Sequence, residues 1–112
     1  MLDTAPLITA AQLLSDRLRT LPESALRRGA AAEGLALARE LARRAQTLEC
    51  PVTTPREMPD VGLFAVGDQL SVAALDLAEI VREVDANDDL TEALGLVRAA
   101  AARITAAATA MR

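Results

Sequence analysis

Apolar residues recur at alternating steps of four and three along most of this chain. In the C-terminal half the alternation runs through two successive segments, Leu63, Val66, Leu70, Ala73, Leu77, Ile80 and Val84, then Leu90, Leu94, Val97, Ala101, Ile104, Ala108 and Met111. These steps place side chains on one face of an α-helix, and a sustained alternation is typical of left-handed bundle packing. The chain is therefore predicted to fold as a bundle of helices.

Two further stripes occupy the N-terminal half. The first consists of Leu7, Ala11, Leu14, Leu18 and Leu21, and the second of Leu26, Ala30, Gly34, Leu37, Leu41, Ala45 and Leu48. Pro22 separates them. Each glycine inside a helix costs about 1 kcal/mol relative to alanine, so Gly29 and Gly34 indicate either a close helix crossing or a break near Gly29. We expect helices over about 5–20, 22–48, 62–84 and 90–111.

Residues 50–60 form the long connection. Pro51, Pro55 and Pro59 forbid a regular helix there, and eleven residues can cross the end or the side of a bundle. The prediction is an all-α, antiparallel four-helix bundle with left-handed, heptad-like packing, in which residues 1–112 form one domain. The core must be built from Leu, Val and Ala, which bury modest areas, so dimerisation is a plausible source of additional buried surface.

The missing residue types restrict the chemistry. The 112 residues include no His, Lys, Trp or Tyr, one Phe and one Cys. Without an imidazole base, a P-loop lysine or zinc-binding spacing, we expect no enzymatic activity, no cofactor and no metal. The lone Cys50 permits no internal disulfide, and the longest uncharged run, 4–15, is too short to span a membrane. A cytoplasmic location is the default expectation.

The charge is negative and unevenly distributed. The net charge is −4, and the C-terminal half carries most of the acids, so binding to nucleic acid or to an anionic membrane is disfavoured. The densest basic cluster, Arg39, Arg43 and Arg44, is interleaved with acids, and a pair between Glu40 and Arg44 explains it without nucleic acid.

The third predicted helix has an unusual outer face. Phe64, Val72 and Leu75 point away from the core stripe, interleaved with Asp68 and Glu79. Asp76, Glu79 and Glu83 lie on the same side, at steps of three and four. Exposed apolar area gives affinity and charge gives register, so this face is a candidate docking surface for a protein partner. The competing interpretation is that the helix starts late, Phe64 covers the core, and Leu75 contacts the long linker.

Two acidic patterns invite a metal interpretation. Asp76, Glu79 and Glu83 lack the histidines that carboxylate-bridged di-metal bundles use. The segment 85–96 begins like a calcium loop, but it has Leu90 where the loop needs Gly and Leu96 where it needs Glu. We therefore interpret 85–89 as a turn between helices, with Asp89 as the helix cap and Glu92 as its reciprocal partner.

The sequence thus predicts a non-enzymatic module for protein–protein interaction, acting as an adaptor, a regulator or an assembly subunit, whose partner is another protein or a second copy. The alternative is a bundle that binds a small apolar ligand over its Ala- and Gly-lined seams.

Overall fold

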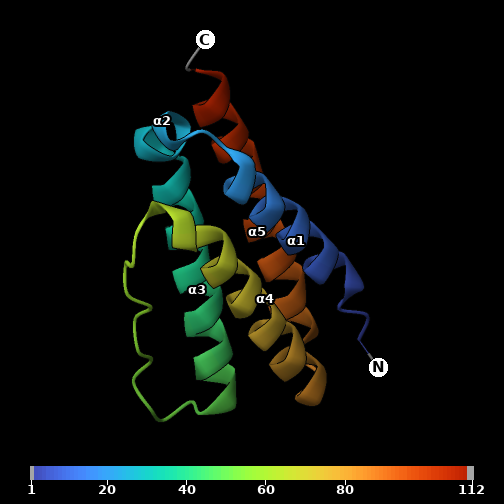
Figure 1. Ribbon diagram of the computed structural model, residues 1–112. Helices are drawn as coiled ribbons and strands as arrows, with labels where there is room; N and C mark the ends of the chain where they lie inside the picture. The colour runs from blue at the N-terminus through green and yellow to red at the C-terminus, as the bar shows by residue number, and fades with distance from the viewer. Residues whose placement is uncertain (1, 111–112) are drawn as a thin grey trace.

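Within residues 2–110 the chain forms four long helices, and the predicted all-α four-helix bundle is confirmed (Figure 1). The computed structural model describes residues 2–110. The helices are α1 (Ala5–Thr20), α3 (Ala31–Glu49), α4 (Val66–Glu83) and α5 (Asn87–Thr109). Three short elements precede α3 and α4: α2 (Glu23–Ala25), the π-helical turn η1 (Leu26–Ala30) and the 3₁₀ turn η2 (Leu63–Ala65). No strand occurs within residues 2–110.

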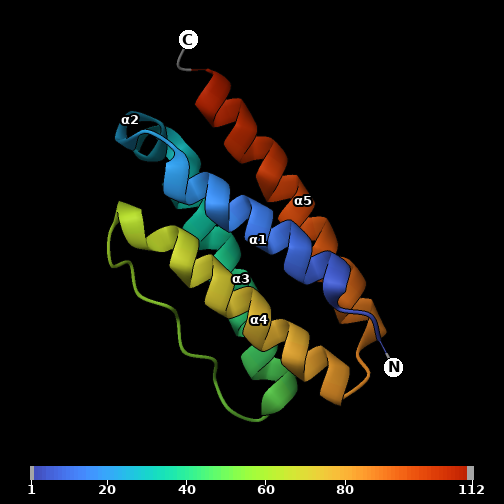
Figure 2. The same cartoon turned by 45° about the vertical axis from the view of Figure 1, so that its right-hand side comes forward.

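The long connection determines the topology. The linker 50–62 returns along the length of α3, so α3 and α4 run in the same direction, and α1 and α5 both run in the opposite direction (Figures 1 and 2). Each of α1 and α3 packs against both α4 and α5. The antiparallel direction predicted for the bundle holds for the packed pairs α1 with α4, α3 with α5, and α4 with α5. It does not hold for α3 with α4 or for α1 with α5, because the linker crosses the side of the bundle.

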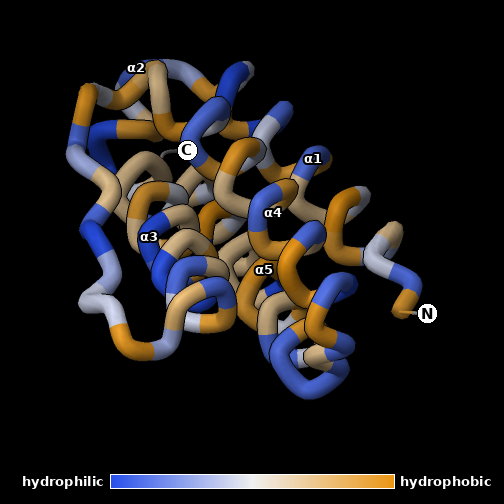
Figure 3. Tube along the Cα trace, turned by 90° about the horizontal axis from the view of Figure 1, so that it is seen from below, coloured by the Kyte–Doolittle hydropathy of each residue, from blue (hydrophilic) through white to orange (hydrophobic). Residues whose placement is uncertain are grey.

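Hydrogen bonds to helix side chains hold this linker in place. Arg39 Nε donates to the Met58 carbonyl at 2.8 Å, and Gln46 exchanges two hydrogen bonds with the Arg56 backbone. Gln69 of α4 donates to the Pro59 carbonyl at 2.8 Å. Figure 3 looks along the bundle and shows the linker outside the helices, on the side of α3.

The two glycines of the second predicted helix, Gly29 and Gly34, behave differently. Gly29 has φ 145° and breaks the helix predicted over 22–48, with open space where a Cβ would stand. Gly34 lies in a close crossing, because a Cβ there would stand 2.6 Å from Val66 Cγ1 and 2.9 Å from Leu18 Cδ1. The break and the close crossing are both present, one at each glycine.

The ends of the last two helices differ from the predicted bounds. The helix expected from 62 begins with η2, and α4 itself starts at Val66, after Gly62 with φ 106°. The helix expected from 90 begins at Asn87, so the capping role predicted for Asp89 is wrong: Ala86 precedes the helix, without a side-chain cap. The predicted end at Met111 lies outside the described residues.

The core consists mainly of leucine and alanine. The α1 stripe is buried as predicted at Leu7, Ala11, Leu14 and Leu18. In α5 the buried stripe is instead Ala93, Val97, Ala100 and Ile104, and Leu94 and Ala101 are only half-buried. In α4 the buried face is wider than one stripe and extends to Ala74, Ala78 and Val81, because this helix packs against both α1 and α3, whereas Val84 is 48% exposed.

Candidate functional site

The outer face of α4 and η2 carries the apolar residues singled out in the sequence, and they are exposed. Phe64 is 70% exposed, Val72 56% and Leu75 45%. Buried positions such as Leu70, Ala73 and Leu77 occupy the opposite side of the same helix. The segment formed by η2 and α4 therefore has a second apolar surface, which does not pack against the other helices.

The competing interpretation of this face is partly correct. The α-helix does start late, at Val66, but Phe64 does not cover the core, because most of its surface remains exposed. The hydrogen bonds of the linker go to α3 and to Gln69 rather than to the outer face around Leu75.

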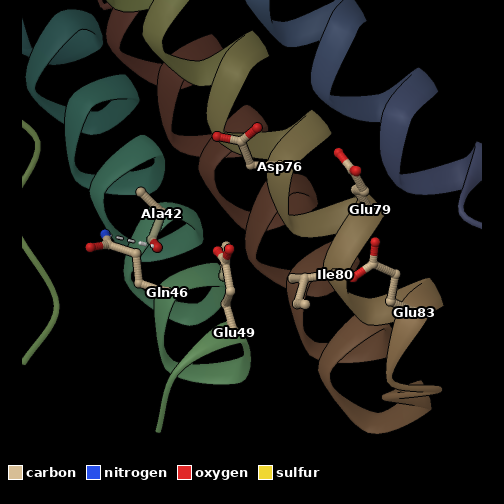
Figure 4. A pocket seen from close by; sticks show the side chains of 8 residues that line it. Ala42, Gln46, Glu49, Asp76, Glu79, Ile80 and Glu83 are labelled. Carbon is tan, nitrogen blue, oxygen red and sulfur yellow. Dashed lines mark hydrogen bonds between the residues drawn. The ribbon is translucent and has the colours of Figure 1, made fainter. Parts of the chain in front are cut away.

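The four acidic residues of this face lie in two places. Asp68 pairs with Arg19 of α1 at 2.8 Å, and Arg19 pairs with Asp16 as well. Asp76, Glu79 and Glu83 line a groove of about 390 Å³ between α4 and the end of α3, opposite Glu49 (Figure 4). The structure thus separates these three carboxylates, at the α3 edge of the face, from Asp68 at the α1 edge.

This acidic groove has no arrangement suited to a metal. Among residues 2–110, no group of three or more Asp, Glu, Cys or His side chains is placed to hold a metal ion. The turn that resembled a calcium loop is made by Asp85, whose φ is 57°, and by a hydrogen bond from the Ala86 backbone N–H to the Val81 carbonyl. The exposed carboxylates of Asp76, Glu79 and Glu83 therefore give the groove a negative charge.

The basic cluster on α3 is neutralised by acids. Glu40 accepts hydrogen bonds from Arg43 and from Arg44, the latter at 2.7 Å, so the predicted Glu40–Arg44 pair is confirmed. The hydrogen bond from Arg43, followed by that from Arg44, holds the pKa of the Glu40 carboxyl below its ordinary value despite partial burial. Arg44 also reaches Glu92 of α5, and this contact raises the pKa of its guanidinium.

A second groove, of about 560 Å³, lies between the parallel helices α1 and α5 and is open to solvent. The lining residues are Ala10, Leu13, Leu14, Asp16, Arg17, Thr20, Val97, Arg98, Ala101 and Thr105. Leu13 is 68% exposed. The alternative hypothesis, a bundle that binds a small apolar ligand, would place that ligand in this groove. The groove is an open trough rather than an enclosed cavity.

The sequence interpretation missed Leu13, Arg17 and Arg98 as candidate residues. A signal existed for Leu13, since it is a leucine beside the α1 stripe rather than in it. Arg17 and Arg98 had no comparable signal, because the side-by-side placement of α1 and α5 depends on the topology.

Cys50, directly after α3, is exposed, and its Sγ lies 2.9 Å from Thr53 Oγ1. In residues 2–110 we find no helix with the length and hydropathy to cross a membrane. No family model, no curated protein and no solved structure matches this chain.

Proposed function

We propose that this protein is a non-enzymatic interaction module, acting in the cytoplasm as an adaptor, a regulator or an assembly subunit, and that it docks through the outer face of α4. The observation that carries the proposal is the exposure of Phe64, Val72 and Leu75 on one acidic helical face. Exposed apolar residues are common singly, but a cluster on one face gives a partner continuous area to cover.

The charged residues around the apolar strip also support the proposal. Asp68, Asp76 and Glu79 lie within four positions of Val72 or Leu75, and Arg82 is the one basic residue of α4. An acidic rim around an apolar strip favours a partner with a basic rim and fixes the register in which the two surfaces meet. The proposed partner surface is thus apolar at its centre and basic at its edges.

The test is affinity capture of the tagged protein from extracts of its own cells, with Leu75→Arg as the test variant. Leu75 is 45% exposed, so this substitution is expected to leave the bundle folded. Val52→Arg is the matched control, because Val52 is 94% exposed on the linker and the change introduces the same charge. A protein captured in stoichiometric amount by the wild type and by Val52→Arg, but not by Leu75→Arg, supports the proposal.

Equal capture by Leu75→Arg contradicts the proposal, because it places the binding surface elsewhere. If Leu75→Arg unfolds, as monitored by far-UV circular dichroism, Phe64→Ala tests the same face at a residue that is 70% exposed. Equal capture by a folded Phe64→Ala variant then contradicts the proposal.

A further inference from the structure

The groove between α1 and α5 has a shape suited to binding a helix. Its floor contains the buried side chains of Leu14 and Val97, and Ala10 and Ala101 keep its walls low. Leu13 adds exposed apolar surface at the α1 edge. Two parallel helices with small residues facing each other leave a straight trough, into which the ridge of a third helix fits.

Two arginines give this trough a positive charge. Arg17 of α1 and Arg98 of α5 both line it, and within the described residues neither has a salt-bridge partner. Asp16, the acid in the lining, is engaged by Arg19 instead, at 2.8 Å. An occupant with an apolar ridge and acidic flanks would therefore satisfy both the floor and the two arginines.

The outer face of α4 has these properties. Val72 and Leu75 form its apolar centre. Asp68 is already paired with Arg19, whereas Asp76 and Glu79 have no salt-bridge partner within the described residues. Asp76 and Glu79 are neighbours on the helix surface, three residues apart. The trough offers one arginine from each of its two helices, Arg17 from α1 and Arg98 from α5. Two free acids therefore meet two free arginines.

One chain cannot join these two surfaces to each other. The α1 residues that face α4 are Gln12, Ser15 and Arg19, whereas those that line the trough are Ala10, Leu13 and Arg17. The two sets occupy opposite sides of α1, so the α4 face and the trough point in different directions. A contact between them therefore requires two molecules.

We infer that the partner of the α4 face is a second copy of this chain, with the Val72–Leu75 strip of one molecule seated in the α1–α5 trough of the next. This inference rests on the proposed function of the α4 face and names its partner. The contact is heterologous, because each molecule uses a different surface on its two sides, and it joins molecules head to tail. Since it pairs exposed acids with exposed arginines, added salt weakens it.

The test uses two variants, each of which removes one of the two surfaces. Leu75→Arg removes the α4 strip, and the double substitution Arg17→Glu with Arg98→Glu reverses the charge of the trough. Both arginines are exposed, so the double variant is expected to fold. Sedimentation velocity and light scattering measure the mass of each protein over a wide concentration range at low salt, with Val52→Arg as the control.

The expected result is a mass that rises with concentration for the wild type and for Val52→Arg, and a monomer for each surface variant alone. An equimolar mixture of the two variants is expected to form a 1:1 complex and nothing larger, because one intact strip and one intact trough remain. The two altered surfaces cannot replace that contact, since both carry net negative charge.

Three outcomes overturn the inference. A wild-type protein that stays monomeric throughout excludes the contact; if Leu75→Arg still abolishes capture of another protein, the proposed function stands and only the inference fails. An assembly that persists in both variants uses a different surface. A monomeric wild type whose melting temperature rises with a long-chain fatty acid, an effect lost on reversing Arg17 and Arg98, assigns the trough to a small ligand instead.

Discussion

Alanine substitutions at Gly67 and Gly95 distinguish the effect of helix packing on stability from the effect of helix propensity. Gly67 of α4 lies against α1, where a Cβ would stand 2.9 Å from the Ser15 carbonyl oxygen and 2.9 Å from Arg19 Cγ. Gly95 of α5 has nothing within 4 Å of that position. Because the Ser15 oxygen belongs to the backbone, a side-chain rotation cannot relieve the contact, and α4 must move away from α1.

The magnitudes follow from these two environments. Replacing an exposed helical glycine by alanine gains about 1 kcal/mol, so Gly95→Ala is expected to raise the free energy of unfolding by up to that amount. Gly67→Ala has a smaller propensity gain, since it lies in the first turn of α4, and overpacking costs about 1–3 kcal/mol. We expect Gly67→Ala to be less stable than Gly95→Ala by about 2–3 kcal/mol, or about 10 °C in melting temperature for a domain of this size.

Urea titration followed by far-UV circular dichroism measures both free energies. Equal m values across wild type and variants are needed, since a changed slope indicates a changed folded or unfolded state rather than a changed contact. If Gly67→Ala proves as stable as Gly95→Ala, then α1 and α4 do not cross closely at Ser15.

Three further predictions use the same assay. Gly29→Ala is expected to lower the free energy of unfolding by about 1–2 kcal/mol although its surroundings are open, because alanine at φ 145° is strained; an unchanged stability would mean that η1 continues as a regular helix. Ser15→Ala is expected to raise it by about 1 kcal/mol, because the buried Ser15 hydroxyl has no hydrogen-bond partner; a loss instead would reveal a bond that this hydroxyl makes. Arg43 and Arg44 lower the pKa of Glu40 in the folded state, so the free energy of unfolding is expected to fall as the pH drops below 4.5, the ordinary pKa of this carboxyl. The fall should be smaller in Glu40→Gln, and an identical pH profile would contradict the pairing.

The sequence predicted helices well where one face alone is buried. Leu7, Ala11, Leu14 and Leu18 of α1 follow a single stripe, and all four are buried. In α5 the alternation selected Leu94 and Ala101, whereas Ala93 and Ala100 are the buried neighbours. Alanine is small enough to accept either environment, so a helix rich in alanine leaves its buried face undefined by hydropathy.

Backbone direction was harder to predict than helical structure. The three prolines showed where the linker lies, but its path depends on partners far away in sequence. The half-buried Arg39 and Gln46 side chains donate to carbonyls of the linker, and nothing in the sequence distinguishes them from other polar residues of the helix. Hence the parallel direction of α3 and α4, and the trough between α1 and α5, could be identified only from the structure.

The candidate docking face was predictable because it depends on one helix only. Val72, Leu75 and Asp76 share a side of α4 through the 3.6-residue repeat, whatever the other helices do. The trough depends on two helices that are about eighty residues apart in sequence, with Ala10 and Val97 brought together by the fold. Local periodicity contains no information about such a pairing.

The crossover also explains which surfaces remain for a partner. A short loop between α3 and α4 would leave the outer side of α3 bare, with the donors of Arg39 and Gln46 facing water. Here the linker lies on that side and accepts those hydrogen bonds, and Met58 packs against the core beside them. The linker has therefore covered the side of α3 that carries Arg39 and Gln46, whereas the strip on α4 and the trough between α1 and α5 have no such cover. An interaction partner is accordingly expected on these two surfaces and not on that side of α3.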